Sequence, residues 1–334
     1  METLRQSERF EANRTPERRA FYGLMPASIS HEGYSEKPMH SYWDDFWAMR
    51  GYKDAVHIAS ALGKADDERR LAVARDEFRH DLYASLDAAT AVHGIDYLPG
   101  AAELGDFDPT SSTIALTPGG EQQFLPPAML KATYDKYWDF FLARRDGRKA
   151  WEDYTPYELR NVSAFVRLGW RERAAQLLDY FYADQRPGKW NQWAEVVGRD
   201  MRQPRFVGDM PHGWISSDYI RAALDSFAYE READQALLLA EGVPVDWLRG
   251  EGIGLHGLRT PYGPLSYKLA AVDGSLSLHV EAMRRTPPGG VVFTWPWDTS
   301  PGAATLNGKP VTWQNRQIRI DTLPAVLKIN GAPL

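Results

Sequence analysis

The stretch His40-Ser-Tyr-Trp-Asp-Asp-Phe-Trp-Ala-Met-Arg50 decides how this chain of 334 residues begins to fold. Ser41 is a residue type that often caps a helix N-terminus, and the two aspartates that follow suit the positive end of the helix dipole. Apolar residues recur at spacings of three and four, as on one face of a helix. That face is expected to carry Tyr42, Phe46, Met49 and Lys53. The stretch therefore predicts a helix that begins after Ser41 and ends at Gly63.

Helical spacing of apolar residues continues along the chain to about residue 240. Further helices are expected over residues 66–92, 128–144, 156–168, 170–181, 213–227 and 232–240. Most connections between them are short or of medium length, which is typical of antiparallel neighbours. The first part of the chain is therefore predicted to be an array of helical hairpins.

The composition and the hydrophobic pattern of the sequence change after Gly242, where glycine, proline and alternating apolar residues dominate. Short strands are expected to begin near Leu265, Leu276, Val291, Ile318 and Ala325. Asp273-Gly274 and Asn307-Gly308 are residue pairs that favour tight hairpin turns. We therefore predict a helical domain over residues 1–241 and an antiparallel β domain, a sandwich, over residues 242–334.

Composition excludes several classes of protein. The formal net charge is −6, without the basic excess of a nucleic-acid-binding protein. No apolar run is long enough to span a membrane, and the charged N-terminal stretch lacks the apolar core of a signal peptide. Cysteine is absent, which excludes disulfides and thiolate chemistry and leaves the compartment unassigned. We expect a soluble protein.

Aromatic residues are abundant, with 12 Trp, 16 Tyr and 13 Phe. Such rings either fill a core or stack on the apolar faces of sugars. Five stretches place aromatic and acidic residues together where the helical pattern breaks: 30–34, 40–47, 102–113, 190–195 and 208–214. Loops on a rigid scaffold are where function usually lies. Two carboxylates in an aromatic cleft, one protonated and one ionised, are the groups that glycoside hydrolysis requires.

Two of these stretches resemble a known superfamily. Tyr42-Trp-Asp-Asp-Phe46 is similar to a Tyr-Trp-Asp element of trehalases and related inverting glycosidases, which have an (α/α)6 toroid. The resemblance implies that Trp43 and Asp44 hold the sugar. Glu103-Leu-Gly-Asp-Phe-Asp108 is similar to the trehalase stretch that carries the general acid. It implies that Asp106 is this acid, with Asp108 and Glu103 as open alternatives.

The stretch from Trp190 to Trp214 resembles the late segment of six-hairpin glycosidases. There a catalytic glutamate precedes a loop and a new helix, which implies that Glu195 is the general base and that Trp214 lines the site. A C-terminal β domain also occurs in such enzymes. The remaining expected substrate contacts are His31, Tyr34, Trp190, Trp193, Asp209 and His212.

Each candidate also has a purely structural interpretation. Trp43 is a plausible core residue, and Asp44 suits a helix dipole. Asp106 and Asp108 fit loop turns, and Glu195 fits a solvated helix position. His212 is equally consistent with a buried, hydrogen-bonded histidine.

The resemblance has a departure in length. A complete toroid needs twelve helices, and about seven or eight are predicted here. We therefore expect an incomplete toroid, or one that further domains or a partner chain complete. His31, Glu32 and His40 lack the spacing of metal ligands on one helix face, so no metal is expected. No phosphate-binding glycine loop or Gly-x-Ser-x-Gly elbow is present, and no cofactor is expected.

The sequence thus predicts an inverting glycoside hydrolase that acts on an oligo- or polysaccharide. One alternative is a polysaccharide lyase or sugar epimerase on a related toroid, for which His31, His40, His212 and Tyr34 are potential proton abstractors. The other alternative is a non-catalytic carbohydrate-binding fragment of a larger enzyme.

Overall fold

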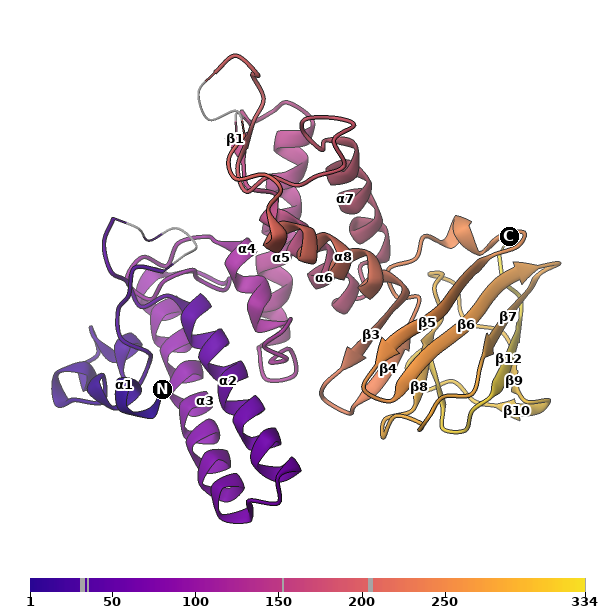
Figure 1. The fold of residues 1–334 in the computed structure, drawn as a ribbon, viewed down its shortest axis with the longest axis horizontal. Coiled ribbons are helices and arrows are strands. Elements are labelled where there is room, and N and C mark those ends of the chain that lie inside the picture. The colour runs from indigo at the N-terminus through magenta and orange to yellow at the C-terminus, as the bar shows by residue number, and fades with distance from the viewer. Residues whose placement is uncertain (31–33, 35, 152, 204–206, 334) are drawn as a thin grey trace. The chain divides into compact units, whose positions relative to one another are not determined.

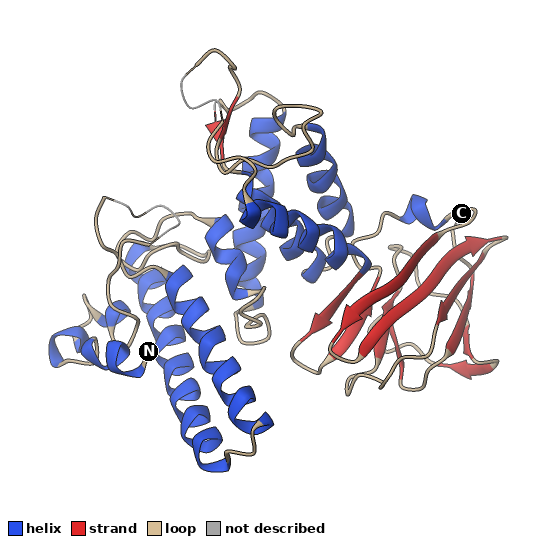
Figure 2. Ribbon diagram, in the orientation of Figure 1, coloured by secondary structure: helices blue, strands red, loops and turns tan. Residues whose placement is uncertain are grey.

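The computed structural model describes residues 1–334 except 31–33, 35, 152, 204–206 and 334 (Figure 1). The chain forms two compact units, Met1–Glu152 and Asp153–Leu334. The first unit is helical, and the second has helices followed by two β-sheets (Figure 2). A helical region followed by a C-terminal β-sandwich, the predicted fold class, is confirmed.

The first unit is built on a hairpin of two long helices, α2 (Tyr42–Ala61) and α3 (Ala65–His93). The predicted apolar face forms its core, where Phe46 and Met49 of α2 and Phe78 and Leu82 of α3 are buried. Helix α3 ends at Gly94, whose positive φ of 62° is the left-handed conformation that closes many helices.

Three shorter or later helices complete the first unit: α1 (Glu2–Ser7), α4 (Pro109–Ser112) and α5 (Pro127–Arg145). Helix α1 is fixed to α3 by Arg5, whose buried guanidinium lies 2.9 Å from Asp81. Helix α5 holds the loop after α3, because the backbone N–H of Leu98 donates to Thr133 Oγ1 at 2.8 Å.

The second unit begins with helices α6 (Arg160–Arg167), α7 (Arg171–Ala183) and α8 (Gly213–Phe227). The two-residue strands β1 (Asp153–Tyr154) and β2 (Val197–Gly198) pair beside them. Helix α6 is buried along most of its length and contacts both α7 and α8. Arg167 of α6 contacts Asp225 of α8 at 2.6 Å, and α8 has the predicted bounds.

The β-sandwich contains ten strands in two sheets. The six-stranded sheet has the order β10 (Lys309–Val311), β9 (Ala304–Leu306), β12 (Ala325–Asn330), β7 (Ser275–Val280), β6 (Gly263–Val272) and β5 (Ile253–Thr260). The four-stranded sheet has the order β11 (Gln317–Ile320), β8 (Val291–Thr294), β4 (Ala236–Leu239) and β3 (Ala228–Arg231). All pairs are antiparallel except β4 with β8.

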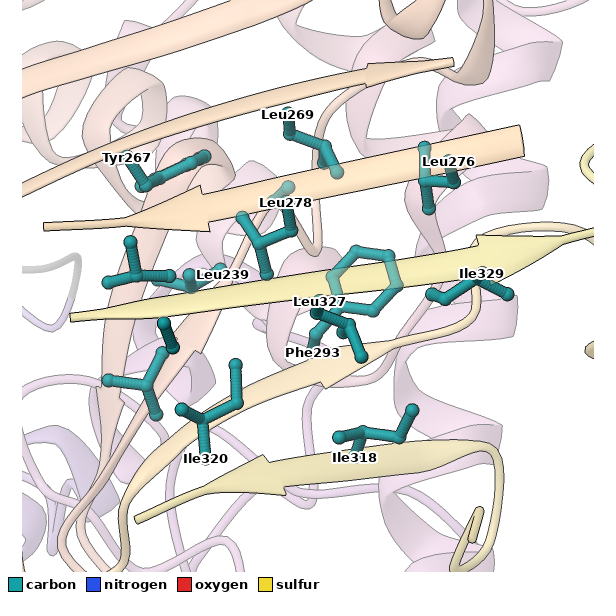
Figure 3. Packing of buried hydrophobic residues seen from close by; sticks show 14 of the residues in the cluster. Leu239, Tyr267, Leu269, Leu276, Leu278, Phe293, Ile318, Ile320, Leu327 and Ile329 are labelled. Atoms are coloured by element: carbon teal, nitrogen blue, oxygen red, sulfur yellow. The ribbon is translucent and has the colours of Figure 1, made fainter. Parts of the chain in front are cut away.

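The two sheets share one hydrophobic core, to which Leu269 and Leu327 of the larger sheet and Phe293 of the smaller sheet contribute (Figure 3). Buried and exposed residues alternate along β7 and β12, as expected for strands with one face on a core. The predicted turn at Asp273-Gly274 joins β6 to β7, with φ angles of 51° and 73°.

One predicted helix is wrong. Residues 232–240 do not form a helix, because β3 and β4 make a hairpin there. All four residues of β4 are buried, and a short run of consecutive apolar residues carries no periodicity that separates a buried strand from a helix. The first strand of the sandwich therefore begins at Ala228. The division of the chain into two domains between residues 241 and 242 remains a prediction.

Six helices of the described residues have eight or more residues: α2, α3, α5, α6, α7 and α8. That number agrees with the expectation of far fewer helices than the twelve of a complete toroid. Within the same described ranges, no helix combines the length and apolar character needed to cross a bilayer.

We expect Leu269→Ala to lower the free energy of unfolding of the second unit by about 2–5 kcal/mol, because the fully buried side chain leaves a cavity in the sandwich core. Val272→Ala on the same strand is the control, since Val272 is 51% exposed and should cost less than about 1 kcal/mol. Denaturant titration followed by circular dichroism measures both. Equal losses for the two variants would contradict the assigned core.

Candidate functional site

The loop after α3 is bonded to the start of α2 by backbone hydrogen bonds. Tyr42 N–H donates to the Gly100 carbonyl, and Ala102 N–H donates to the His40 carbonyl, each at 3.0 Å. This pairing places the acidic stretch 103–108 beside the Trp43-Asp44 element of α2. Two stretches that the sequence analysis singled out separately thus meet in the first unit.

Asp106 is half-buried and is held by two donors. Its Oδ1 accepts a hydrogen bond from the Ala101 N–H at 2.9 Å, and its Oδ2 accepts one from the Tyr34 hydroxyl at 2.7 Å. Burial, the hydrogen bond to Asp106 and the nearby carboxylates hold the pKa of Tyr34 well above its usual range. Tyr34 therefore remains a protonated phenol that fixes one oxygen of Asp106.

The hydrogen bond between Tyr34 and Asp106 passes close to the backbone of Gly100, where a side chain would block it. A Cβ atom at this position would lie 2.3 Å from the Tyr34 hydroxyl oxygen and 2.7 Å from Asp106 Oδ2. Real Cβ atoms do not approach other atoms so closely, so only glycine allows Tyr34 and Asp106 to meet over the backbone at this point.

Glu103 is engaged by His40. The His40 backbone N–H donates to Glu103 Oε2 at 2.9 Å, and the ring Nδ1 lies 2.6 Å from Oε1. Burial alone would lower the pKa of His40, but the hydrogen bond and charge of Glu103 raise it. Burial would raise the pKa of Glu103, but the hydrogen bond and charge of His40 hold it below its usual value. Glu103 is thus the counter-ion of His40, which favours Asp106 over Glu103 as a proton donor.

Asp108 caps the short helix α4. Its Oδ1 accepts the Ser111 N–H at 3.0 Å, and its Oδ2 accepts the Ser111 hydroxyl at 2.6 Å. This is the turn-forming role that the sequence also allowed. Both of its oxygens bond the same residue, Ser111, so Asp108 has a structural role at the start of α4.

The Trp43-Asp44 element presents its carboxylate and buries its ring. Trp43 is only 5% exposed and packs edge-on against Trp47, with ring centroids 5.8 Å apart. Trp47 is 38% exposed, so it carries the accessible ring at this end of α2. Asp44 is half-buried and accepts a hydrogen bond from Ser28 Oγ at 2.6 Å.

Asp45, the next residue, is fully buried. Its Oδ1 accepts the Met25 N–H at 2.9 Å, and its Oδ2 has no hydrogen-bond partner among the described residues. Burial raises the pKa of Asp45 to about 8, against the opposing effects of the Met25 N–H and His40. A neutral carboxyl group therefore lies beneath the Trp43-Asp44 element at neutral pH.

The second unit brings together the later candidates. Glu195 N–H donates to the Asp209 carbonyl at 3.0 Å, and His212 N–H donates to the Trp193 carbonyl at 2.8 Å. These bonds align two extended segments, so that Trp193, Glu195, Asp209 and His212 lie on neighbouring stretches of chain. Trp193 is buried and packs on Tyr219, whose ring centroid is 5.2 Å away, whereas Glu195 is half-buried.

Trp214 belongs to an aromatic cluster at the start of α8. The Tyr157 ring packs edge-on against both Trp214 and His212, with centroids 5.6 and 5.7 Å away. The Arg160 guanidinium lies 4.2 Å from the Tyr157 centroid, and its Nε donates to Asp218 at 2.8 Å. Trp214 is 37% exposed, so this cluster has an accessible face.

Tyr157, Arg160 and Trp47 are the residues of these clusters that the sequence analysis did not select. Tyr157 and Arg160 are three residues apart at a helix start marked by Pro156, a spacing that places them on one face. Their pairing with Trp214 depends on a contact between distant segments, which local spacing does not reveal.

The predicted site residues thus form two groups. The first unit holds Tyr34, Trp43, Asp44, Glu103, Asp106 and Asp108. The second unit holds Trp190, Trp193, Glu195, Asp209, His212 and Trp214. Trp190, at 62% exposed, and Asp209 are on the surface, and His31 lies outside the described residues. Pairing of Asp106 with Glu195 remains a prediction, because each belongs to a different unit.

No protein-family model matches the chain, and no curated protein matches it. Among solved structures, an alpha-L-rhamnosidase from Dictyoglumus thermophilum is similar, with a TM-score of 0.48 and 12% sequence identity. The similarity covers 84% of this chain and 31% of the rhamnosidase chain, so this chain spans less than a third of that protein's length.

We expect the thermal stability of the first unit to fall as the pH rises from about 4 to about 8, in part through Asp45. The unfolded chain ionises Asp45 near 3.8, whereas the folded chain keeps it protonated to about 8, so folding takes up a proton in this window. Asp45→Asn should flatten this part of the pH dependence of Tm. Asp87→Asn, an exposed position on α3, is the control and should keep the wild-type slope. An unchanged slope in Asp45→Asn would contradict the assignment.

Proposed function

We propose that this chain hydrolyses glycosidic bonds of an oligo- or polysaccharide with inversion, using Asp106 as the general acid and Glu195 as the general base. The observation that carries the proposal is the setting of Asp106. Its half-buried carboxyl group is fixed by Tyr34 and Ala101 on a loop bonded to the helix that presents Asp44 and Trp47. A fixed carboxyl group, on a loop bonded to a helix that carries an exposed ring and a second carboxylate, suits protonation of a sugar oxygen.

Tyr34 supports the acid role in both protonation states of Asp106. A phenol hydroxyl donates one hydrogen bond and also accepts. When Asp106 is ionised, the Tyr34 hydroxyl donates to its Oδ2 across 2.7 Å. When Asp106 carries the proton, its O–H can donate a hydrogen bond to the phenol oxygen. After Asp106 gives the proton to the substrate, the Tyr34 hydroxyl donates to the resulting carboxylate.

The surrounding residues suit a sugar as ligand. Asp44 has one oxygen engaged by Ser28, and its other oxygen can accept from sugar hydroxyls. Trp47 offers an accessible ring on which the apolar face of a pyranose can stack.

The role of Glu195 rests on its neighbours in the second unit. The backbone bond to Asp209 places Glu195 next to Trp193, on segments that lead to the exposed ring of Trp214. Inversion requires its carboxyl group to lie roughly 6.5–9.5 Å from that of Asp106, so that water fits between the base and the sugar.

The lyase or epimerase alternative receives no support from Tyr34, His40 and His212, the candidate proton abstractors that the structure describes. Tyr34 has a raised pKa, which disfavours the phenolate that such a base requires. His40 is committed to Glu103, and the Nδ1 of His212 accepts the Ile215 N–H at 3.4 Å as the N-cap of α8.

Asp106→Asn and Glu195→Gln are each expected to lower kcat by about 100-fold or more while the fold is kept, because each removes a proton-transfer group. Hydrolysis is measured as release of reducing sugar from a panel of neutral and acidic glycans. Asp87→Asn and Glu172→Gln, which change exposed carboxylates on α3 and α7, are the matched controls and should keep wild-type rates. Wild-type turnover in either site variant would remove that residue from the mechanism.

Tyr34→Phe is expected to lower kcat by about tenfold to a hundredfold with little change in KM, because it removes one hydrogen bond to a charged group. A variant with a lowered Tm but wild-type kcat would show that Tyr34 acts only in folding.

A further inference from the structure

A cluster of three tryptophans lies on two loops of the β-sandwich, far along the sequence from every residue of the proposed catalytic mechanism. Trp295 and Trp297 follow strand β8, and Trp313 follows strand β10. The ring centroids of Trp295 and Trp297 are 4.6 Å apart, and those of Trp295 and Trp313 are 5.9 Å apart. We call these residues the indole cluster.

The indole cluster is only partly buried in the hydrophobic core of the sandwich. Trp297 and Trp313 are only partly buried, so each leaves part of its ring accessible. Trp295 is 2% exposed, and its Nε1 has no hydrogen-bond partner within the described residues. A buried N–H without a partner costs stability, and the large apolar area that Trp295 buries in the core offsets that cost. The parts of the cluster open to a ligand are therefore the accessible faces of Trp297 and Trp313.

The two loops are held in place before any ligand arrives. Trp313 Nε1 donates to the Gly302 carbonyl at 2.9 Å, which joins its loop to the one after β8. Arg316 donates to the carbonyls of Trp297 and Asp298. A site with fixed aromatic side chains loses less entropy when a ligand binds.

Arg316 has a positive φ angle, and its side-chain hydrogen bonds to the carbonyls of Trp297 and Asp298 explain why arginine is found there. Asn315 and Arg316 have φ angles of 49° and 65° at the tip of a turn closed by two backbone bonds of 2.9 Å between Gln314 and Gln317. Glycine or asparagine is the usual choice for such angles, and arginine there costs stability. The side-chain bonds from Arg316 to the neighbouring loop give a reason for its presence.

Free polar groups border the exposed rings. Asp298, Thr299, Ser300, Gln314 and Asn315 are all exposed. In the part of the chain that the structure describes, their side chains make no hydrogen bond to the protein. Aromatic faces flanked by hydroxyl, amide and carboxylate groups match a sugar ring, which has an apolar face and a rim of hydroxyls.

We infer that the indole cluster is a carbohydrate-binding site for a neutral saccharide, separate from the proposed catalytic residues. Trp297 and Trp313 supply the stacking surfaces, and Asp298 and Gln314 bond the hydroxyls. The charges of Asp298 and Arg316 balance, which favours a neutral ligand over a uronate. The inference does not depend on hydrolysis, because binding at the sandwich requires no chemistry.

Affinity electrophoresis of the full chain tests this site. Gels contain xylan, galactomannan, mixed-linkage β-glucan or pullulan, and mobility is compared with a gel that lacks polysaccharide. We expect at least one of them to retard the wild type. Trp297→Ala and Trp313→Ala should each weaken binding to that glycan by about tenfold, since each removes a stacking ring. Trp247→Ala is the matched control, because Trp247 is a 52% exposed tryptophan of the same unit outside the cluster.

Further variants keep the result decisive. Gln314→Ala removes an exposed polar group without disturbing the packing, and it should weaken binding several-fold even if Trp313→Ala fails to fold. Trp47→Ala removes the exposed ring that the proposed hydrolytic site uses, so it reports how much of the retardation comes from the first unit.

Three results would overturn the inference. One is a wild type that none of the glycans retards. Another is binding by folded Trp297→Ala and Gln314→Ala that equals that of Trp247→Ala. The third is loss of binding in Trp47→Ala alone, which would place the sugar in the first unit and leave the proposed hydrolytic function standing.

Discussion

The backbone pairing between the start of α2 and the loop after α3 is the constraint on which the proposed acid depends. Two hydrogen bonds, from Tyr42 to Gly100 and from Ala102 to His40, fix the loop against the rigid α2–α3 hairpin. Because Gly100 has no side chain, Tyr34 reaches Asp106 over it. The His40–Glu103 ion pair closes the same junction from the other side. A carboxyl group on a free loop would lack the fixed position that proton transfer needs.

The second unit joins a β-sandwich to three helices through buried contacts. Its core is continuous between the two sheets, and the helices α6 to α8 are tied to it by buried polar contacts. Arg171 at the start of α7 donates to the Val243 carbonyl at 2.6 Å, and Tyr267 of β6 donates to the Phe227 carbonyl at 2.7 Å. Arg171 is only 8% exposed, and this burial lowers the pKa of its guanidinium.

Much of the fold followed from local patterns, and the exceptions have physical reasons. Helix α8 and the turn at Asp273-Gly274 were predicted because periodicity and turn chemistry act within a few residues. The hairpin of β3 and β4 was missed because all four residues of β4 are buried and apolar, so the strand has no polar face to reveal a period. Residues 236–239 form a strand because they pair with β8, which lies some fifty residues further along the chain.

The candidate site was predictable in its residue types but not in its contacts. The sequence left Asp106, Asp108 and Glu103 as alternatives for the acid, and the choice among them remains a prediction. Asp108 bonds Ser111 within a local helix cap, whereas the contact of Glu103 with His40 joins segments that are distant in the sequence. Trp43 was expected to line the site, yet it is buried and Trp47 has the exposed ring. The burial of a side chain at the start of a helix depends on which other segments pack against it. The residues next to it in the sequence do not reveal those segments.

The most direct test of the account is proton NMR of the products at early times, with the wild-type chain and a panel of glycans of known anomeric configuration. The account predicts a new reducing end whose first-formed anomer is opposite to that of the cleaved bond, because water attacks from the face away from Asp106. Absence of any new reducing end, or appearance of an unsaturated uronide in its place, would contradict it.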